Sequence, residues 1–546
     1  MGSGSLLERR LRVASGVGRL SIAAAAVFGA TIVWRLFTFS GFNNDHYAHL
    51  ALAQQMLLGD RPIRDFADPG WPLTYLISAA AWRVAGSAMW VEWAVTATAF
   101  AAGAALTVLA AERLSGSVAL AVLVAAFEVL IAPRTYAYPK ILPYAAFAVL
   151  IVARGTPSTR RLVWIGLVVA AAFLLRHDHG LWIGLAALAY TALASLSDGM
   201  RPTLRRSALV IGTAAAALLP WTAFVAMHGG VLPYFQTALE FSRAEANASM
   251  LRELPWFGRG ASADAWLFSL FWALPAAAAA LVADSWRRGQ ERWPGERAAV
   301  AALVVLAVCV NVGFLRDVLR TRLADAVVPA ALLGAWLLGI VLREGWAHGP
   351  VRRLVQAASV ALVGTSMVSM SIVAELGEQV ERTNVRAGIS GLSDRYRRVR
   401  QVLGQPHRQK ETMPSRVAAV LMPFFAYLDR CTLPTERLIV AGEFPDVVVL
   451  AGRRFASDGV VFGGGYSSVA FQHRTLDRLR AHPALFAILV SEADFRRRFP
   501  LVAGYVDQAY APFTGLAEQG LHVSILALGE RVPTGTDADT GWPCFT

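Results

Sequence analysis

Long apolar runs are the feature that most constrains how this chain folds. Eleven of them follow one another before residue 374, and they cover residues 20–39, 89–111, 118–132, 141–152, 162–175, 181–196, 208–226, 265–283, 298–314, 323–342 and 354–373. A helix needs about 20 apolar residues to cross the hydrocarbon of a bilayer, where every backbone polar group must be bonded internally. The chain is 56% hydrophobic and 16% charged. We therefore predict a polytopic α-helical membrane protein with about eleven spans.

Basic residues indicate how these spans are oriented. The net charge of +13 comes largely from arginines in short loops between apolar runs, which is typical of cytoplasmic loops and not of nucleic-acid binding. The N-terminal arginines precede an apolar run without a small-residue cleavage site, so we expect an uncleaved anchor that starts in the cytoplasm. Eleven crossings then place the C-terminal tail outside. Alanine-rich spans and a preference for arginine over lysine indicate the cytoplasmic (inner) membrane of a bacterium.

The tail is expected to form a separate α/β domain outside the cytoplasm. Strand-like apolar runs cover residues 437–443, 446–452, 484–491 and 521–529, and they alternate with helical stretches at 415–430 and 473–482. We predict a membrane domain at residues 1–374, with an outer loop at 40–72, and an extracytoplasmic domain at 375–546. Cys431 and Cys544 can form a disulfide in an oxidising compartment or remain two thiols.

The predicted topology collects polar segments on one face of the membrane. These segments are residues 43–72, 133–140, 176–179, 228–264 and 316–322. A shorter apolar piece, 72–86, is interrupted by Arg83 and is expected to be a half-span that returns to the same side. Charges near bilayer depth are costly and usually persist for a functional site. The outer face is therefore where we expect chemistry.

The first of these segments begins with the sequence GFNNDHYAHL, which predicts a helix capped by Asn43 or Asn44 that ends near residue 58. Asp45 and His49 are four residues apart, and His46 and His49 are three apart, so they are expected to be neighbours on the helix. An opposite apolar stripe predicts that the helix lies along the membrane interface. Asp45 can act as a general base toward an acceptor hydroxyl, or it can simply stabilise the helix N-terminus.

The loop resembles a known family. An Asp followed by an amphipathic helix with Tyr and Ala at matching places, then Gly, R-D-F and P-L-x-Y-L, is similar to the first outer loop of GT-C glycosyltransferases. The branch of aminoarabinose and protein mannosyl transferases is the most similar. In that family the aspartate is the catalytic base, and the match places it on Asp45. The resemblance implies an inverting glycosyltransferase that moves a sugar from a polyprenyl phosphate to a cell-envelope glycan, lipid or protein.

The chain also departs from that family. Many relatives carry Lys-Pro-Pro where this chain has Gly70-Trp71-Pro72, and many carry a second Asp where it has Lys140. A cation at Lys140 can replace the missing lysine, since the charge on a leaving phosphate must be neutralised. The candidate phosphate-binding residues are Arg134, Lys140, Arg176, Arg316, Arg320 and Arg322. Each can instead extend to the interface for purely structural reasons.

Further polar residues are candidates for substrate or metal binding. The substrate-binding candidates are His46, His49, Tyr138, His177 and Asp178. A divalent cation, used by some GT-C relatives, would be held by Asp45, His49, His177 and His179, although the HxH spacing is equally explained by a hydrogen-bonded turn, and no metal is the default expectation. The alternative function is a lipid-linked substrate transporter or flippase. A transporter is expected to show broken helices and polar residues at mid-membrane, whereas the polar residues here gather at one face.

Overall fold

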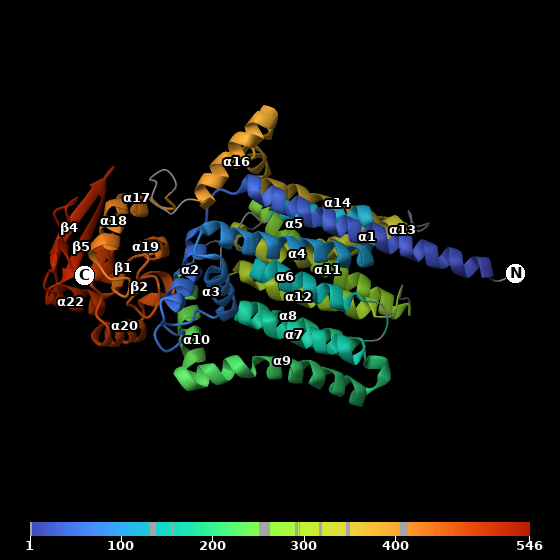
Figure 1. The fold of residues 1–546 in the computed structure, drawn as a ribbon. Coiled ribbons are helices and arrows are strands. Elements are labelled where there is room, and N and C mark those ends of the chain that lie inside the picture. The colour runs from blue at the N-terminus through green and yellow to red at the C-terminus, as the bar shows by residue number, and fades with distance from the viewer. Residues whose placement is uncertain are drawn as a thin grey trace. The chain divides into compact units, whose positions relative to one another are not determined.

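The computed structural model describes residues 3–131, 138–153, 155, 157–249, 263–289, 293, 295–315, 319–344, 350–404 and 413–546. Figure 1 shows the helices and strands of the chain. Contacts divide the chain into two compact units. The first unit comprises Met1–Phe39, Ala94–Leu219 and Arg252–Val399, and the second comprises Ser40–Trp93, Pro220–Leu251 and Arg400–Thr546. The outer loop thus groups with the C-terminal tail, whereas the sequence had assigned it to the membrane domain.

The first unit is a helical bundle. Its helices are α1 (Ser3–Thr38), α4 (Met89–Ser115) from Ala94 onward, α5 (Val118–Ile131), α6 (Tyr138–Ile151), α7 (Thr159–Leu175), α8 (His177–Leu193), α9 (Met200–His228) as far as Leu219, α11 (Ala263–Arg287), α12 (Glu296–Asn311), α13 (Leu319–Glu344), α14 (Pro350–Val373), α15 (Leu376–Arg382) and most of α16 (Gly388–Gly404). Each of the eleven predicted apolar runs falls on one of the helices α1, α4 to α9 and α11 to α14.

Fewer of these helices than expected are long enough to cross a bilayer. Among the described residues seven qualify by length and composition, and they are Gly18–Thr38, Met89–Ser115, Met200–His228, Ala263–Arg287, Glu296–Leu315, Asp325–Arg343 and Arg353–Val373. Helices α5 and α6 have 14 residues each, and α7 and α8 have 17. At 1.5 Å per residue, 14 residues extend about 21 Å, which is short of a hydrocarbon core of about 30 Å. The count of eleven spans therefore stays a prediction.

Small residues let the helices of the first unit approach closely. A Cβ added to Gly103 of α4 would lie 2.7 Å from the side chain of Ile141 on α6. A Cβ added to Gly166 of α7 would lie 2.7 Å from Thr213 on α9. Such contacts are the usual way in which helices associate in lipid, where the solvent is as apolar as the interface. The bundle therefore has the packing expected of a membrane domain.

The second unit contains a five-stranded mixed sheet in the order β2-β1-β3-β5-β4 (Figure 1). Its strands are β1 (Arg437–Ala441), β2 (Arg454–Phe455), β3 (Phe486–Leu489), β4 (Tyr510–Glu518) and β5 (Leu521–Leu528). Strands β2, β1 and β3 are parallel, with Ile439 opposite Ala487, and β3, β5 and β4 are antiparallel. A separate pair joins β6 (Gly535–Thr536) to β7 (Pro543–Cys544). The predicted small mixed sheet is present.

Helices flank this sheet much as the sequence indicated. They are α17 (Arg416–Val420), α18 (Met422–Cys431), α19 (Pro445–Ala451), α20 (Val469–Ala481), α21 (Glu492–Arg498) and α22 (Pro500–Ala509). One prediction was wrong, because the run at 446–452 forms α19 and no strand. Pro445 stands at the first helical position and Asp446 in the first turn, and both favour a helix start. Cys431 and Cys544 form a disulfide, which decides between the two alternatives that the sequence left open.

Three helices from earlier in the chain complete the second unit. They are α2 (Asn44–Leu57), α3 (Pro72–Ala85) and α10 (Val231–Ser249). Gln55 of α2 accepts a hydrogen bond from the backbone N–H of Phe455 at 3.0 Å and donates to its carbonyl at 2.9 Å. Side chains on several faces of α2 are buried, and they include those of His46 and His49. Protein therefore covers the polar side of α2 as well as its apolar stripe, and a position along the membrane interface stays a prediction.

Candidate functional site

Local sequence explains how α2 is positioned. The side chain of Asn43 accepts a hydrogen bond from the backbone N–H of His46 at 3.0 Å, so Asn43 is the N-cap. Asp45 follows in the first turn, where a negative charge is favoured by the helix dipole. After Leu58 the chain turns at Gly59, whose φ of +102° suits glycine. The predicted helix and its cap are confirmed.

Three of the four aspartates in the outer loop have structural roles. Asp60 is buried, and its two oxygens accept hydrogen bonds from Arg437 at 2.7 and 2.8 Å. Asp65 pairs with the neighbouring Arg64 and accepts a hydrogen bond from the backbone N–H of Arg61. These carboxylates hold the loop together and are engaged by cations of the same unit.

Asp68 is the third of these structural carboxylates. It is buried, and it accepts hydrogen bonds from the backbone N–H of Gly70 at 2.9 Å and from the hydroxyl of Tyr234 at 2.9 Å. The first of these bonds closes a turn before α3, and the second ties the loop to α10. Both are contacts that shape the loop.

Asp45 differs from the other three. Of these four described aspartates it alone is exposed. His46 and His49 are completely buried, so the four-residue spacing between Asp45 and His49 does not give them a shared environment. The predicted neighbours His46 and His49 do lie together, with 4.4 Å between their ring centroids. Asp45 is therefore the most exposed carboxylate of this loop.

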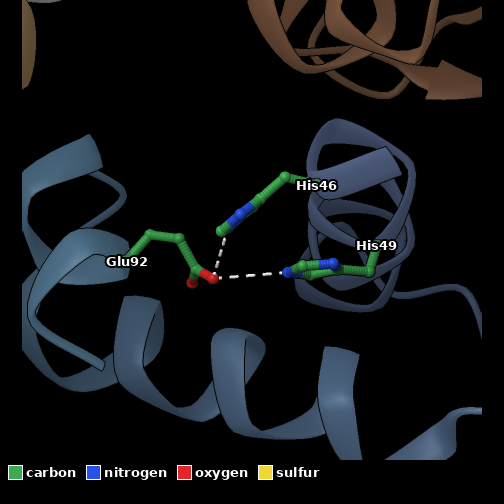
Figure 2. A group of neighbouring side chains, drawn as sticks. All are labelled: His46, His49 and Glu92. Carbon is green, nitrogen blue, oxygen red and sulfur yellow. Dashed lines mark hydrogen bonds and ion pairs between the residues drawn. The ribbon is translucent and has the colours of Figure 1, made fainter. Parts of the chain in front are cut away.

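The two buried histidines meet a residue that the sequence analysis did not select. Figure 2 shows His46 and His49 projecting from α2 toward Glu92, which lies in the first turn of α4. The distance from Glu92 Oε1 is 2.8 Å to His46 Nε2 and 3.3 Å to His49 Nε2. We call these three residues the His46 cluster. Its signal in the sequence was a carboxylate inside an apolar run, which is unusual in lipid.

Aromatic rings enclose the His46 cluster. Phe42 lies 4.3 Å from the ring of His46, and Trp71 meets the ring of His49 edge-on at 6.1 Å. Burial lowers the pKa of His46 to about 4, and the neighbouring His49 adds to this shift, while Glu92 opposes it. His46 is therefore a neutral imidazole at neutral pH, with a lone pair on one ring nitrogen.

A second polar group lies in the first unit, at the starts of α6, α8 and α13. We call it the Lys140 group, and its members are Lys140, Tyr144, Arg176, Asp178, His179, Arg322 and Asp325. Lys140 is buried and forms an ion pair with Asp325, which also lies 3.5 Å from Arg322. Asp325 interacts electrostatically with Arg176 and His179 as well. Three predicted phosphate-binding residues are thus brought together.

The RHDHG turn supplies the other half of the Lys140 group. Arg176 Nε donates to both oxygens of Asp178, at 2.9 and 3.2 Å. His179 is buried and is hydrogen-bonded through Nδ1 to Tyr144. His177 is bonded through Nδ1 to the carbonyl of Phe173 at 2.7 Å. These contacts fit the hydrogen-bonded turn that was the alternative to a metal site.

The remaining predicted residues are either buried or outside the part of the chain that the structure describes. Tyr138 is the first residue of α6 and is buried. Arg134 and Arg316 lie outside the described residues, and Arg320 belongs to α13 with its side chain outside the described part. Asp45, His46 and His49 belong to the second unit, whereas the Lys140 group belongs to the first. Each unit therefore contains one set of candidate residues.

Comparisons with known proteins complete the description. No family model matches the chain, and no curated protein matches it. It is similar to a crystal structure of the oligosaccharyltransferase from Archaeoglobus fulgidus tethered with an acceptor peptide, at 12% identity and a TM-score of 0.47, covering 92% of this chain and 74% of that one. A complex of that enzyme with an inhibitory peptide and a dolichol-phosphate matches at 11% identity and a TM-score of 0.45, covering 94% and 75%.

Proposed function

We propose that this chain is a membrane glycosyltransferase of the GT-C type, with Asp45 as its general base. The observation that carries the proposal is the exposure of Asp45. It alone is exposed among the four described aspartates of residues 40–72, and it lies in the first turn of a helix that buried contacts hold in place. It is also the aspartate to which the loop's resemblance assigns catalysis. The exposure of Asp45 and the resemblance of the loop both support this residue as the base.

The proposed reaction is an inverting transfer from a polyprenyl-phosphate sugar. Asp45 takes the proton from an acceptor hydroxyl, and the hydroxyl oxygen forms a bond to the anomeric carbon. The bond from that carbon to the phosphate oxygen breaks, and polyprenyl phosphate leaves with the electron pair. A positioned general base contributes typically about 10² to 10⁴ in rate. The acceptor is a glycan, a lipid or a protein of the cell envelope.

The Lys140 group is the proposed binding site for the donor phosphate. Its three cations, Lys140, Arg176 and Arg322, outnumber its two carboxylates, Asp178 and Asp325. The side chain of Arg176 is 27% exposed, whereas that of Lys140 is only 3% exposed. Arg176 is therefore the residue that we propose contacts the phosphate, and Lys140 holds Asp325 and the surrounding helices in place. An excess cation in poorly solvated surroundings suits a leaving phosphate.

The disulfide supports an extracytoplasmic location for the second unit. Cys431 and Cys544 are separated by 113 residues in sequence and are bonded in the structure. Such bonds persist in oxidising compartments and are rare in the cytosol. We therefore propose that the second unit lies outside the cytoplasmic membrane of a bacterium, on the face where Asp45 would meet an envelope acceptor.

Continuous helices favour an enzyme over a transporter. Helices α9, α11 and α13 run through Pro220, Pro275 and Pro329 without interruption. Transporter sites are typically built from discontinuous helices near the bilayer midplane. The three described helices that contain these prolines are continuous.

The test compares purified wild-type protein with Asp45→Asn on a panel of polyprenyl-phosphate sugars. We expect wild type to release polyprenyl phosphate and Asp45→Asn to be slower by about 10² or more. The matched control is Asp65→Asn, a change of the same kind in the same loop at a carboxylate already paired with Arg64. It is expected to keep its activity within a few-fold. Equal turnover by Asp45→Asn would remove Asp45 as base, and no turnover of any donor would favour a transporter.

A further inference from the structure

The His46 cluster has the composition of a metal site. Two imidazoles and one carboxylate offer ligand atoms that all lie within 4.8 Å of one another. All three side chains are completely buried. Two histidines and one glutamate form a donor set that zinc enzymes use, with three protein ligands and a fourth position open to water or substrate. The site is thus defined by chemistry as well as by proximity.

Two distances within the cluster, from Glu92 to each histidine, are close to those that a tetrahedral metal requires. Zinc binds nitrogen and oxygen at about 2.0 to 2.1 Å, so two ligand atoms of a tetrahedral site lie about 3.3 to 3.4 Å apart. His49 Nε2 is 3.3 Å from Glu92 Oε1, and His46 Nε2 is 2.8 Å from the same oxygen. Moving His46 by about half an ångström would therefore make room for the metal–ligand geometry. Rotation of a side chain can supply a shift of that size.

The positions of the ligands on their helices also fit a metal site. His46 and His49 are three residues apart on α2, so their rings lie on one side of that helix. Glu92 comes from the first turn of a different helix, α4. A metal at this point would join two segments that are 43 residues apart in the chain. It would also fix the first turn of α2, which carries Asp45.

The surroundings favour a bound cation. The aromatic rings of Phe42 and Trp71 border the cluster, and an apolar shell around a metal limits the access of water. A buried carboxylate is costly unless positive charge compensates it, and a divalent cation supplies that charge. The competing explanation is a hydrogen-bonded His–Glu–His triad that only stabilises the fold. The two explanations differ in what the purified protein contains.

We infer that His46, His49 and Glu92 form a binding site for a divalent transition metal, best suited to Zn²⁺, that positions the helix bearing Asp45. Imidazole nitrogen favours zinc and its neighbours over magnesium or calcium, which prefer oxygen ligands. The site differs from the set of Asp45, His49, His177 and His179 considered from sequence. It does not depend on the proposed transfer reaction, so failure of the Asp45→Asn test would leave it standing.

The test measures metal content and metal-dependent stability in the full-length protein. Wild type purified from zinc-supplemented medium, without a metal-affinity tag, is expected to contain about one Zn²⁺ per chain by mass spectrometry. Removing it with a chelator should lower the midpoint of thermal unfolding, and adding Zn²⁺ should restore it. Co²⁺ added to the stripped protein should give the visible absorption bands of a four-coordinate nitrogen and oxygen site.

Variants identify the ligands. Glu92→Gln keeps the shape of the side chain but removes its charge, and His49→Gln removes one nitrogen ligand. Both are expected to lose at least tenfold in zinc affinity, whereas His522→Gln, at an exposed histidine on β5, should match wild type. If a variant fails to fold, the Co²⁺ spectrum of wild type still decides the matter. A wild type without stoichiometric zinc, cobalt bands or a chelator effect would overturn the inference, as would folded Glu92→Gln and His49→Gln with wild-type affinity.

Discussion

Two buried clusters, one in each unit of the molecule, balance their charges in different ways. In the first unit, the Lys140 group sets three cations against two carboxylates in direct ion pairs. In the second unit, Glu92 is hydrogen-bonded to two imidazoles, which carry charge only when they are protonated. Asp45, the residue before His46, is exposed. The first arrangement suits an incoming anion, and the second suits a proton or a metal cation.

The largest expected effect concerns the buried pair of the first unit. Lys140→Met leaves Asp325 without its closest cation, and removing one partner of a buried pair costs about 3 to 5 kcal/mol of unfolding free energy. Arg322 moderates the loss, so the lower end of that range is expected. The double variant Lys140→Met/Asp325→Leu should recover much of the stability. The measurement is the free energy of unfolding in detergent. Arg382→Met, which breaks an exposed ion pair with Glu378, is the control and should lower that free energy by less than about 1 kcal/mol.

The stability of the second unit should depend on its disulfide, whereas that of the first unit should not. Cys431→Ser with Cys544→Ser opens a link between residues separated by 113 positions, and losses of about 2 to 4 kcal/mol are typical. A reducing agent should have the same effect on wild type. Cys309→Ser in α12, which lies outside the disulfide, provides the control. A second unit that unfolds at the same temperature with and without reductant would show that the bond does not constrain it.

The comparison predicts a binding defect for the first unit. Arg176→Gln removes a charged donor from the proposed phosphate site, and a lost charged hydrogen bond of about 1.5 to 3 kcal/mol corresponds to a rise of roughly 10- to 150-fold in the KM for the donor. The turnover number should change much less, because Arg176 is proposed to hold the phosphate in the bound state as well. Arg160→Gln, at the exposed start of α7, should leave both constants unchanged. If Arg176→Gln left the donor KM unaltered, Arg176 would not be a ligand of the donor phosphate.

The smallest expected effect tests how α2 is held. Asn43→Ala removes the side-chain cap on the backbone N–H of His46, and losing such a cap costs about 1 kcal/mol. Asn43→Asp keeps an acceptor at this position and should restore stability. Transferase activity should follow stability in the two variants, because the cap positions the turn that carries Asp45. Wild-type stability in Asn43→Ala would mean that buried contacts alone fix this helix.

Some parts of this architecture were readable in the sequence because they depend on local patterns. The apolar runs, the helix capped by Asn43 and the mixed sheet of the tail all follow from periodicity and capping chemistry. The run at 446–452 misled because a short apolar segment without periodicity fits a strand or a buried helix equally well. The count of eleven spans stays a prediction: seven of the described helices are long enough to cross a bilayer, and hydropathy marks apolar runs better than it marks their ends.

The partners of the candidate residues were harder to predict. The cations of the Lys140 group were found because arginine and lysine between apolar runs are conspicuous. Asp325 and Glu92 were missed because each lies within or beside an apolar run, far in sequence from the residue it contacts. Which of the loop's aspartates is exposed depends on contacts with the sheet and with α10, such as those from Arg437 and Tyr234. Only the folded chain shows these contacts.

The most direct test of the account separates turnover from donor binding in Asp45→Asn. Steady-state release of polyprenyl phosphate is measured over a range of donor concentrations, with Asp65→Asn in parallel. The account predicts a fall in kcat of about 10² to 10⁴ with a donor KM close to that of wild type, because the base acts on the acceptor and not on the phosphate. A kcat for Asp45→Asn equal to that of wild type would contradict it.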